Sequence, residues 1–159
     1  MTPSPRIIVS HPTGNSFVRA VIEELDSLGQ LERFYTTIGI GKEASSLTRI
    51  LASRRKYSIP DSRISRQWFP EACRLLPYRQ GCQEQRRRRV DQSYESLDLK
   101  VAKELHRHPG FSLHAYEDCA VESFRMAKEL GIRRSYEMPI AHWATVRRLL
   151  AEEAERLPD

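Results

Sequence analysis

Two kinds of segment alternate along the chain. Short runs rich in β-branched and aromatic residues, typical of strands, lie at 6–10, 32–39, 63–69, 111–116 and 132–138. Segments with an apolar residue every three or four positions, typical of helices, lie at 17–28, 90–105, 120–130 and from about 141 onward. Strands that alternate with helices in this way predict an α/β protein with a mostly parallel sheet.

The segment 111–131 is the clearest unit in this pattern. A short apolar strand is followed by a polar turn with adjacent carboxylates, Glu117 and Asp118, and then by an amphipathic helix that Gly131 ends. Ligands of open parallel sheets bind beyond the carboxyl ends of the strands. We therefore expect the chemistry of this protein near the turn from Tyr116 to Asp118.

A second turn of the same kind joins the first strand to the first helix. Backbone N–H groups freed at a helix N-terminus can receive a phosphate or a sugar hydroxyl, and Gly14 would allow close approach. One glycine is not a dinucleotide fingerprint. The alternative is that Gly14 only shapes the turn while Asn15 or Ser16 caps the helix.

The segment from about 41 to 82 is irregular. Leu47, Ile50 and Leu51 fit one short helix, and prolines surround the strand expected at 63–69, which suggests an edge strand. The following helix, 90–105, is preceded by the run Arg86–Arg89. Cations near a helix N-terminus oppose the helix dipole, so this run favours an anionic partner or the nearby acidic residues.

Composition narrows the class of protein. The 159 residues, 40% of them hydrophobic, fit one domain over 1–159. Neither a spanning segment nor a signal peptide is indicated, so we expect a cytoplasmic protein. Three cysteines without C-x-x-C spacing argue against a disulfide framework and a zinc site. Cys119 is expected to pack at a helix start, with a nucleophilic thiolate as the alternative.

The net charge of +5 is concentrated in Arg86–Arg89 and Arg54–Lys56. Such clusters can contact phosphates of nucleic acid, anionic lipid or a substrate, or form a solvated surface. The arginine run lacks interleaved aromatic residues and any nucleic-acid reading motif, so nucleic acid is not an expected partner. Both clusters are candidates for peripheral contact with the inner face of the membrane, and a solvated charged surface is the alternative for each.

Four segments together resemble a known family. They are the strand and turn at 7–14, Leu113–Asp118, the helix end Ala127–Gly131, and Tyr136–Ile140 before a tryptophan-bearing helix. Nearly the whole chain is similar to the N-terminal half of a family 4 glycosyltransferase of GT-B architecture. The resemblance implies a Rossmann-like, three-layer α/β domain. Against the family's His-x-His-Glu strand end, His114 matches the first histidine, Tyr116 replaces the second, and Glu117 matches the acid.

The resemblance also implies a function. In that family the N-terminal domain receives the acceptor, while a C-terminal domain with an E-x7-E signature binds most of the nucleotide-sugar donor, and configuration is retained. We expect that C-terminal domain to be absent from a chain ending at Asp159, and no resident cofactor. The implied function is an acceptor-side domain, inactive without a donor-binding domain or subunit, for a sugar or lipid-linked acceptor. The alternative is a non-catalytic Rossmann-like module that holds a nucleotide or an acidic partner.

The expected site gathers residues from three strand ends. Glu117 and Asp118 are the candidate catalytic groups that orient an acceptor hydroxyl, with helix capping as the alternative for Asp118. The candidate substrate-binding residues are His11, Gly14, Asn15, His114, Tyr116 and Glu137. For His114 and Tyr116 the alternative is a structural role in the core. This site requires the three strand ends to lie along one edge of the sheet.

Overall fold

The structure, a computed structural model, describes residues 6–43, 55–75, 83–138 and 143–157. The elements, in chain order, are β1 (Ile7–Ser10), α1 (Ser16–Ser27), β2 (Leu31–Thr36), the 3₁₀ helix η1 (Asp61–Arg63), β3 (Ile64–Arg66), α3 (Trp68–Leu75), α4 (Gln83–Arg107), β4 (Ser112–Tyr116), α5 (Val121–Glu129), β5 (Arg134–Glu137) and α6 (Trp143–Arg156).

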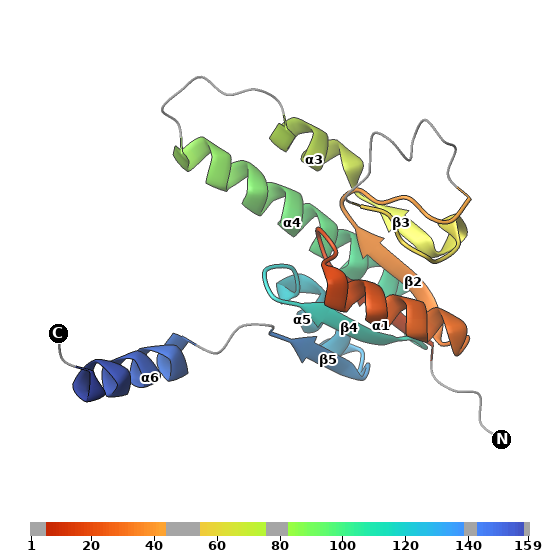
Figure 1. Ribbon diagram of the computed structural model, residues 1–159. Helices are drawn as coiled ribbons and strands as arrows, with labels where there is room; N and C mark the ends of the chain where they lie inside the picture. Colours follow the sequence, from red (N-terminus) through yellow and green to blue (C-terminus); the bar gives the residue numbers. More distant parts are fainter. Residues whose placement is uncertain (1–5, 44–54, 76–82, 139–142, 158–159) are drawn as a thin grey trace.

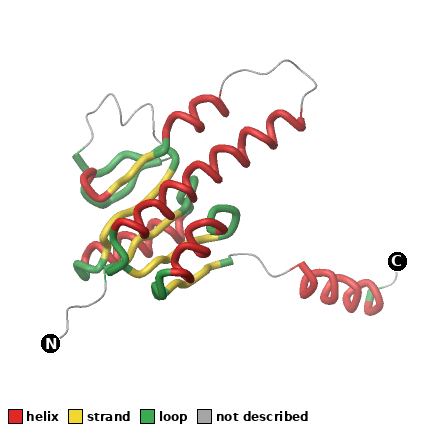
Figure 2. The backbone as a smooth tube through the Cα atoms, turned by 180° about the vertical axis from the view of Figure 1, so that it is seen from behind, coloured by secondary structure: helices red, strands yellow, loops and turns green. Residues whose placement is uncertain are grey.

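The strands of the described residues form one sheet in the order β3-β2-β1-β4-β5, and every neighbouring pair is parallel. The chain moves outward from β1 to β3 and then crosses back over the sheet to β4 (Figure 1). The topological switch point therefore lies between β1 and β4. The prediction of a Rossmann-like α/β domain is confirmed, with α1 on one face of the sheet and α4 and α5 on the other (Figures 1 and 2).

The sheet buries side chains on both faces because successive residues of a strand point in opposite directions. Ile8 and Leu113 join the core beneath α4 and α5. Val9, Phe34 and Tyr116 join the core beneath α1. The alternation fixes the direction of each side chain at the strand ends, where the candidate residues lie.

The two helices that follow candidate turns begin differently. The Oδ1 atom of Asn15 accepts a hydrogen bond from Val18 N at 2.9 Å and caps α1. At α5 the cap comes from another helix, since the Asp98 carboxylate of α4 accepts from the backbone N–H groups of Glu122 and Ser123 at 2.6 and 3.1 Å. The interpretation of Asp118 as the cap of α5 is therefore wrong.

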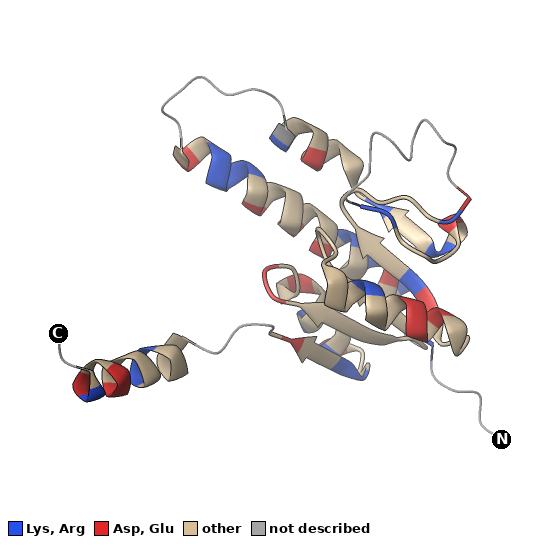
Figure 3. Ribbon diagram, viewed as in Figure 1, with Lys and Arg blue, Asp and Glu red and all other residues tan. Residues whose placement is uncertain are grey.

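The middle of the chain differs from the prediction at two points. The strand expected at 63–69 ends at Arg66, because Trp68 and Phe69 already belong to α3. Helix α4 begins earlier than expected, so the arginine run lies within its first turns (Figure 3). The ion pair between Arg88 and Glu84, at 2.6 Å and with i,i+4 spacing, supports this start. The helix predicted around 47–51 lies outside the described residues.

Helix α6 stands apart from the other layers (Figure 1). None of its residues is buried, although several are large and apolar. Of the helices that the structure describes, none has the length and apolar character to cross a membrane.

Candidate functional site

The carboxyl ends of the neighbouring strands β1, β4 and β5 lie side by side, and the switch point is between the first two. Ser10 is in register with Ala115, and Tyr116 with Glu137. His11, which follows β1 directly, reaches the ring of Tyr116. The expected meeting of the three strand ends is thus present at one edge of the sheet. We call the residues gathered on its α1 side the strand-end cluster: His11, His114, Tyr116, Ser135 and Glu137.

Tyr116 occupies the centre of this cluster. Its side chain is fully buried, and its ring lies edge-on to His11 and His114, with centroid separations of 5.0 and 4.9 Å. Burial, followed by the negative charge of Glu137, raises the pKa of the Tyr116 hydroxyl. The tyrosine therefore stays protonated at neutral pH and acts as a hydrogen-bond donor.

His11 is held as a neutral imidazole by its own turn. Its Nδ1 atom accepts hydrogen bonds from the backbone N–H groups of Thr13 and Gly14 at 3.1 and 2.7 Å. Burial lowers the pKa of His11 from 6.5 to about 4. With Nδ1 as an acceptor, the proton of the neutral ring is on Nε2, which is a donor. These two N–H groups, expected to meet an anion, are directed at the histidine instead.

His114 links β4 to β5. Its Nδ1 atom lies 2.8 Å from Ser135 Oγ, and its Nε2 atom lies 3.6 Å from Glu137 Oε2. Because a carboxylate only accepts, the tautomer that fits has its proton on Nε2 and receives the serine hydroxyl at Nδ1. Burial lowers the pKa of His114, and Glu137 opposes this shift. His114 thus connects β4 to two residues of β5, Ser135 and Glu137.

Glu137 is the acidic group of the cluster. Its side chain is 39% exposed, and its carboxylate lies against both His114 and Tyr116. Among the described residues, neither the Tyr116 hydroxyl nor His114 Nε2 completes a hydrogen bond of ordinary geometry, although both atoms are buried. Buried donors of this kind normally have a partner. A carboxylate flanked by two such donors can receive a hydroxyl, which both donates and accepts.

Glu117 and Asp118 lie away from this cluster. Tyr116 ends β4 and points toward α1, whereas Glu117 lies in the following turn. The electrostatic neighbour of Glu117 is Tyr136, whose ring packs on Phe124 of α5. Asp118 is exposed in a left-handed conformation with φ of 71°. The structure therefore brings Glu137, not the two adjacent carboxylates, to the histidines.

Gly14 and Asn15 shape the turn that positions His11. Gly14 has φ of +62°, and a Cβ atom there would lie 2.1 Å from the Tyr57 hydroxyl oxygen. That hydroxyl donates to Thr13 O at 3.2 Å. The amide oxygen of Asn15 is engaged in capping, as described above. These contacts require a glycine and a short polar residue at the two positions.

Sequence reasoning missed two features. Ser135, which fixes His114, has no signal beyond its place in a short strand. The second feature surrounds the fully buried Glu71 of α3, whose carboxylate contacts Arg55 Nη2 at 2.8 Å and Arg74 Nε at 2.7 Å. Burial alone would raise the pKa of Glu71, but the two arginines hold it below its usual value. Because Arg55 also donates to Thr37 at 2.7 Å, this group braces the end of β2.

Other chemistry is not supported in the described part of the chain. Burial raises the pKa of Cys119 to about 12, and its thiol packs in the core, so a nucleophilic thiolate is not formed at neutral pH. No group of three or more histidine, cysteine or acidic side chains among the described residues is arranged to hold a metal ion.

Comparisons with known proteins add little to this geometry. No protein-family model matches the chain, and a search of curated proteins finds no match. A solved structure, the C-terminal domain of a hydrogenase from Pyrococcus furiosus, is similar over 86% of this chain and 97% of that chain, with 15% identity and a TM-score of 0.43. A likeness of this extent carries no argument about function.

Proposed function

We propose that this chain is the acceptor-side domain of a retaining, nucleotide-sugar-dependent glycosyltransferase, and that the strand-end cluster binds the acceptor hydroxyl. The observation that carries the proposal is the position of Glu137 at the carboxyl end of β5, one strand from the switch point of a Rossmann-like sheet, against two buried donors. Such a position is where open α/β sheets bind their ligands. The family resemblance supplies the class of reaction.

The charge of the cluster favours a neutral polyol. His11 and His114 both have lowered pKa values and are neutral at pH 7, so Glu137 carries the only formal charge of the cluster. A phosphate would meet this carboxylate unfavourably, whereas a sugar hydroxyl can donate to it. The hydroxyl oxygen can in turn accept from the Tyr116 O–H or from the Nε2–H of His114, the two buried donors beside the carboxylate.

The transfer itself needs a donor from elsewhere. The acceptor oxygen forms a bond to the anomeric carbon while the bond from that carbon to the nucleotide phosphate breaks, and the hydroxyl proton passes to Glu137 or to the departing phosphate. In this proposal the nucleotide-sugar is held by a donor-binding domain or subunit. The domain described here binds and orients the acceptor, which is the positional part of catalysis.

A non-catalytic nucleotide module is less well supported. The N–H groups of Thr13 and Gly14, which such a module would offer to a phosphate, donate to His11. In the arginine run, Arg88 pairs with Glu84, and Arg89 donates to Cys73 O at 2.8 Å. For a lipid-linked acceptor, contact of this run with anionic lipid at the inner membrane face remains part of our proposal.

The test is an NMR titration of the ¹⁵N-labelled chain with free glucose, galactose, mannose and N-acetylglucosamine, and separately with UDP and UDP-glucose. We expect at least one sugar to shift the amides of His11, Tyr116 and Glu137 at millimolar concentration, and E137Q to abolish these shifts. The matched control is E117Q, which changes a carboxylate in the turn after β4, outside the cluster. Tight binding of UDP, or no sugar response at the cluster, would contradict the proposal.

A further inference from the structure

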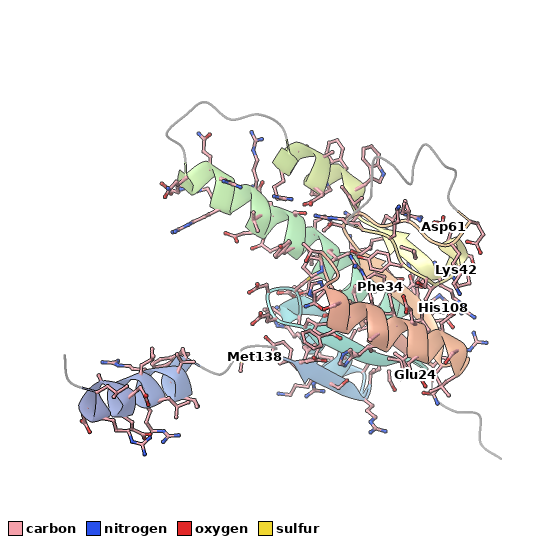
Figure 4. The ribbon with its side chains drawn as sticks, viewed as in Figure 1. Glu24, Phe34, Lys42, Asp61, His108 and Met138 are labelled. Atoms are coloured by element: carbon pink, nitrogen blue, oxygen red, sulfur yellow. The ribbon has the colours of Figure 1, made fainter. Side chains whose placement is uncertain are left out.

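A groove on the α1 face of the sheet begins at the strand-end cluster. It has a volume of about 360 Å³, and small-molecule sites usually measure roughly 300–1,000 Å³. His114 and Ser135 of the cluster are among the residues that line it. Helix α1 runs alongside β4 and β5, and Met138 marks the carboxyl end of β5 (Figures 1 and 4). Because the groove continues the candidate acceptor site, its chemistry indicates which class of acceptor the site would take.

The groove has an apolar wall and a polar floor. The wall is formed by half-buried side chains of β1 and α1, namely Ile7, Val21 and Leu25. The floor is formed by side chains of β4 and β5, namely Ser112, His114 and Ser135. A second sugar ring in the groove would direct hydroxyls at the wall, which offers them no partner, and an unpaired polar group is costly. An apolar stem therefore fits the groove better than a second sugar.

A cation lines the groove at the end opposite the cluster. Arg133 precedes β5 and Glu137 ends it, so their Cα atoms lie roughly 13 Å apart at about 3.3 Å per residue. None of the described residues that line the groove is acidic, and Arg133 is exposed. A ligand that extends along the groove thus meets a negative charge at the carboxyl end of β5 and a positive charge at its amino end.

From these surfaces we infer that the acceptor is an anionic amphiphile. Its reacting hydroxyl lies at Glu137, an apolar stem lies along Val21 and Leu25, and an anionic group contacts Arg133. The inference rests on the proposed function, because it extends the acceptor that the strand-end cluster binds. Burial of the stem adds affinity in proportion to the apolar surface removed from water, and a guanidinium can donate to two oxygens of an anion at once. The reverse orientation is disfavoured because it places the anion against Glu137.

The test compares the methyl, octyl and ω-carboxyoctyl glycosides of each sugar in the panel above, titrated below their micelle concentrations into the ¹⁵N-labelled chain. We expect the octyl glycoside to bind at least about tenfold more tightly than the methyl glycoside, and to shift the amides of Val21 and Leu25 as well as those of the cluster. The terminal carboxylate should strengthen binding by a further factor of about three or more.

Two variants separate the contributions of the stem and the anion. Val21→Thr places a hydroxyl in the wall and should reduce the gain from the octyl chain, and Arg133→Gln should remove the gain from the carboxylate. The matched controls are Val121→Thr, at an exposed position that begins α5, and Arg134→Gln, which the alternation of β5 directs to the α5 face. Both controls should bind every glycoside as the wild type does. The spectrum without ligand shows whether each variant is folded.

Failure of this inference can be told apart from failure of the proposed function. Methyl glycosides that shift no amide of the strand-end cluster would contradict the proposed function itself. If the methyl glycosides bind at the cluster and the octyl chain adds no affinity, only the inference is overturned. It is also overturned if the carboxylate has the same effect on binding to the wild type and to Arg133→Gln, because the anion then does not contact this arginine.

Discussion

Acidification should destabilise the fold through His11. The pKa of His11 is lowered from 6.5 to about 4 by burial, so the unfolded chain binds a proton more readily than the folded one. Stability from this group is therefore complete above about pH 6.5 and is lost as the pH falls toward about 4. The full pKa shift corresponds to roughly 3 kcal/mol in the free energy of unfolding. Because the His11 ring is only partly buried, we expect the protein to lose about 2 kcal/mol of stability through this group at about pH 4.5.

The perturbation that isolates this term is His11→Asn. The asparagine oxygen can accept from the N–H groups of Thr13 and Gly14, as Nδ1 does now, but it does not titrate. Urea unfolding at about pH 7.5 and about pH 4.5 should show that the loss of stability on acidification is about 2 kcal/mol smaller in the variant than in the wild type. The residual pH dependence includes His114, whose pKa is also lowered.

Two results would refute this reasoning. One is an equal loss of stability on acidification in the wild type and in His11→Asn. The other is an NMR titration that places the pKa of His11 near its ordinary value. The matched control is His106→Gln, which removes an exposed histidine of α4 outside the cluster.

Three further predictions concern stability, each measured by urea unfolding. Gly14→Ala should cost about 2–4 kcal/mol, because the residue has a positive φ and its Cβ would meet Tyr57; a cost below about 1 kcal/mol would contradict this contact. Asp98→Ala should lower the free energy of unfolding by about 1–2 kcal/mol because α5 loses its cap, whereas Asp118→Gly should leave it unchanged. A larger loss in Asp118→Gly than in Asp98→Ala would show that Asp118 is the cap. Glu71→Gln should cost about 3–5 kcal/mol by leaving two arginines without their carboxylate, and a neutral effect would show that the group is not a brace.

Local sequence patterns were sufficient for most of the fold. The β-branched run before His11 and the apolar spacing of 17–28 predict β1 and α1 within a residue or two. Local sequence patterns did not predict features that depend on contacts between residues far apart in the chain. The cap of α5 comes from Asp98, 24 residues before Glu122, and nothing local distinguishes it from Asp118. Likewise, Glu71 of α3 is buried among arginines, a contact that spacing alone does not reveal.

The candidate site was predictable in position and less so in detail. The rule that ligands bind at strand ends places His11, Tyr116 and Glu137 together, and the parallel register brings them to one edge. The face of each side chain was harder to foresee. Tyr116 ends β4 and points toward α1, whereas Glu117 lies in the following turn near Tyr136. The carboxylate that resembles the family motif is therefore not the one beside the histidines.

The most direct test of the acceptor-site claim compares the affinity of one sugar for three proteins. With the best ligand of the NMR panel, the wild type and E117Q should have the same Kd, and E137Q should bind at least about tenfold more weakly, as expected for loss of a charge-assisted hydrogen bond. If E137Q binds as tightly as the wild type, or if E117Q is the variant that loses affinity, the strand-end cluster is not the acceptor site.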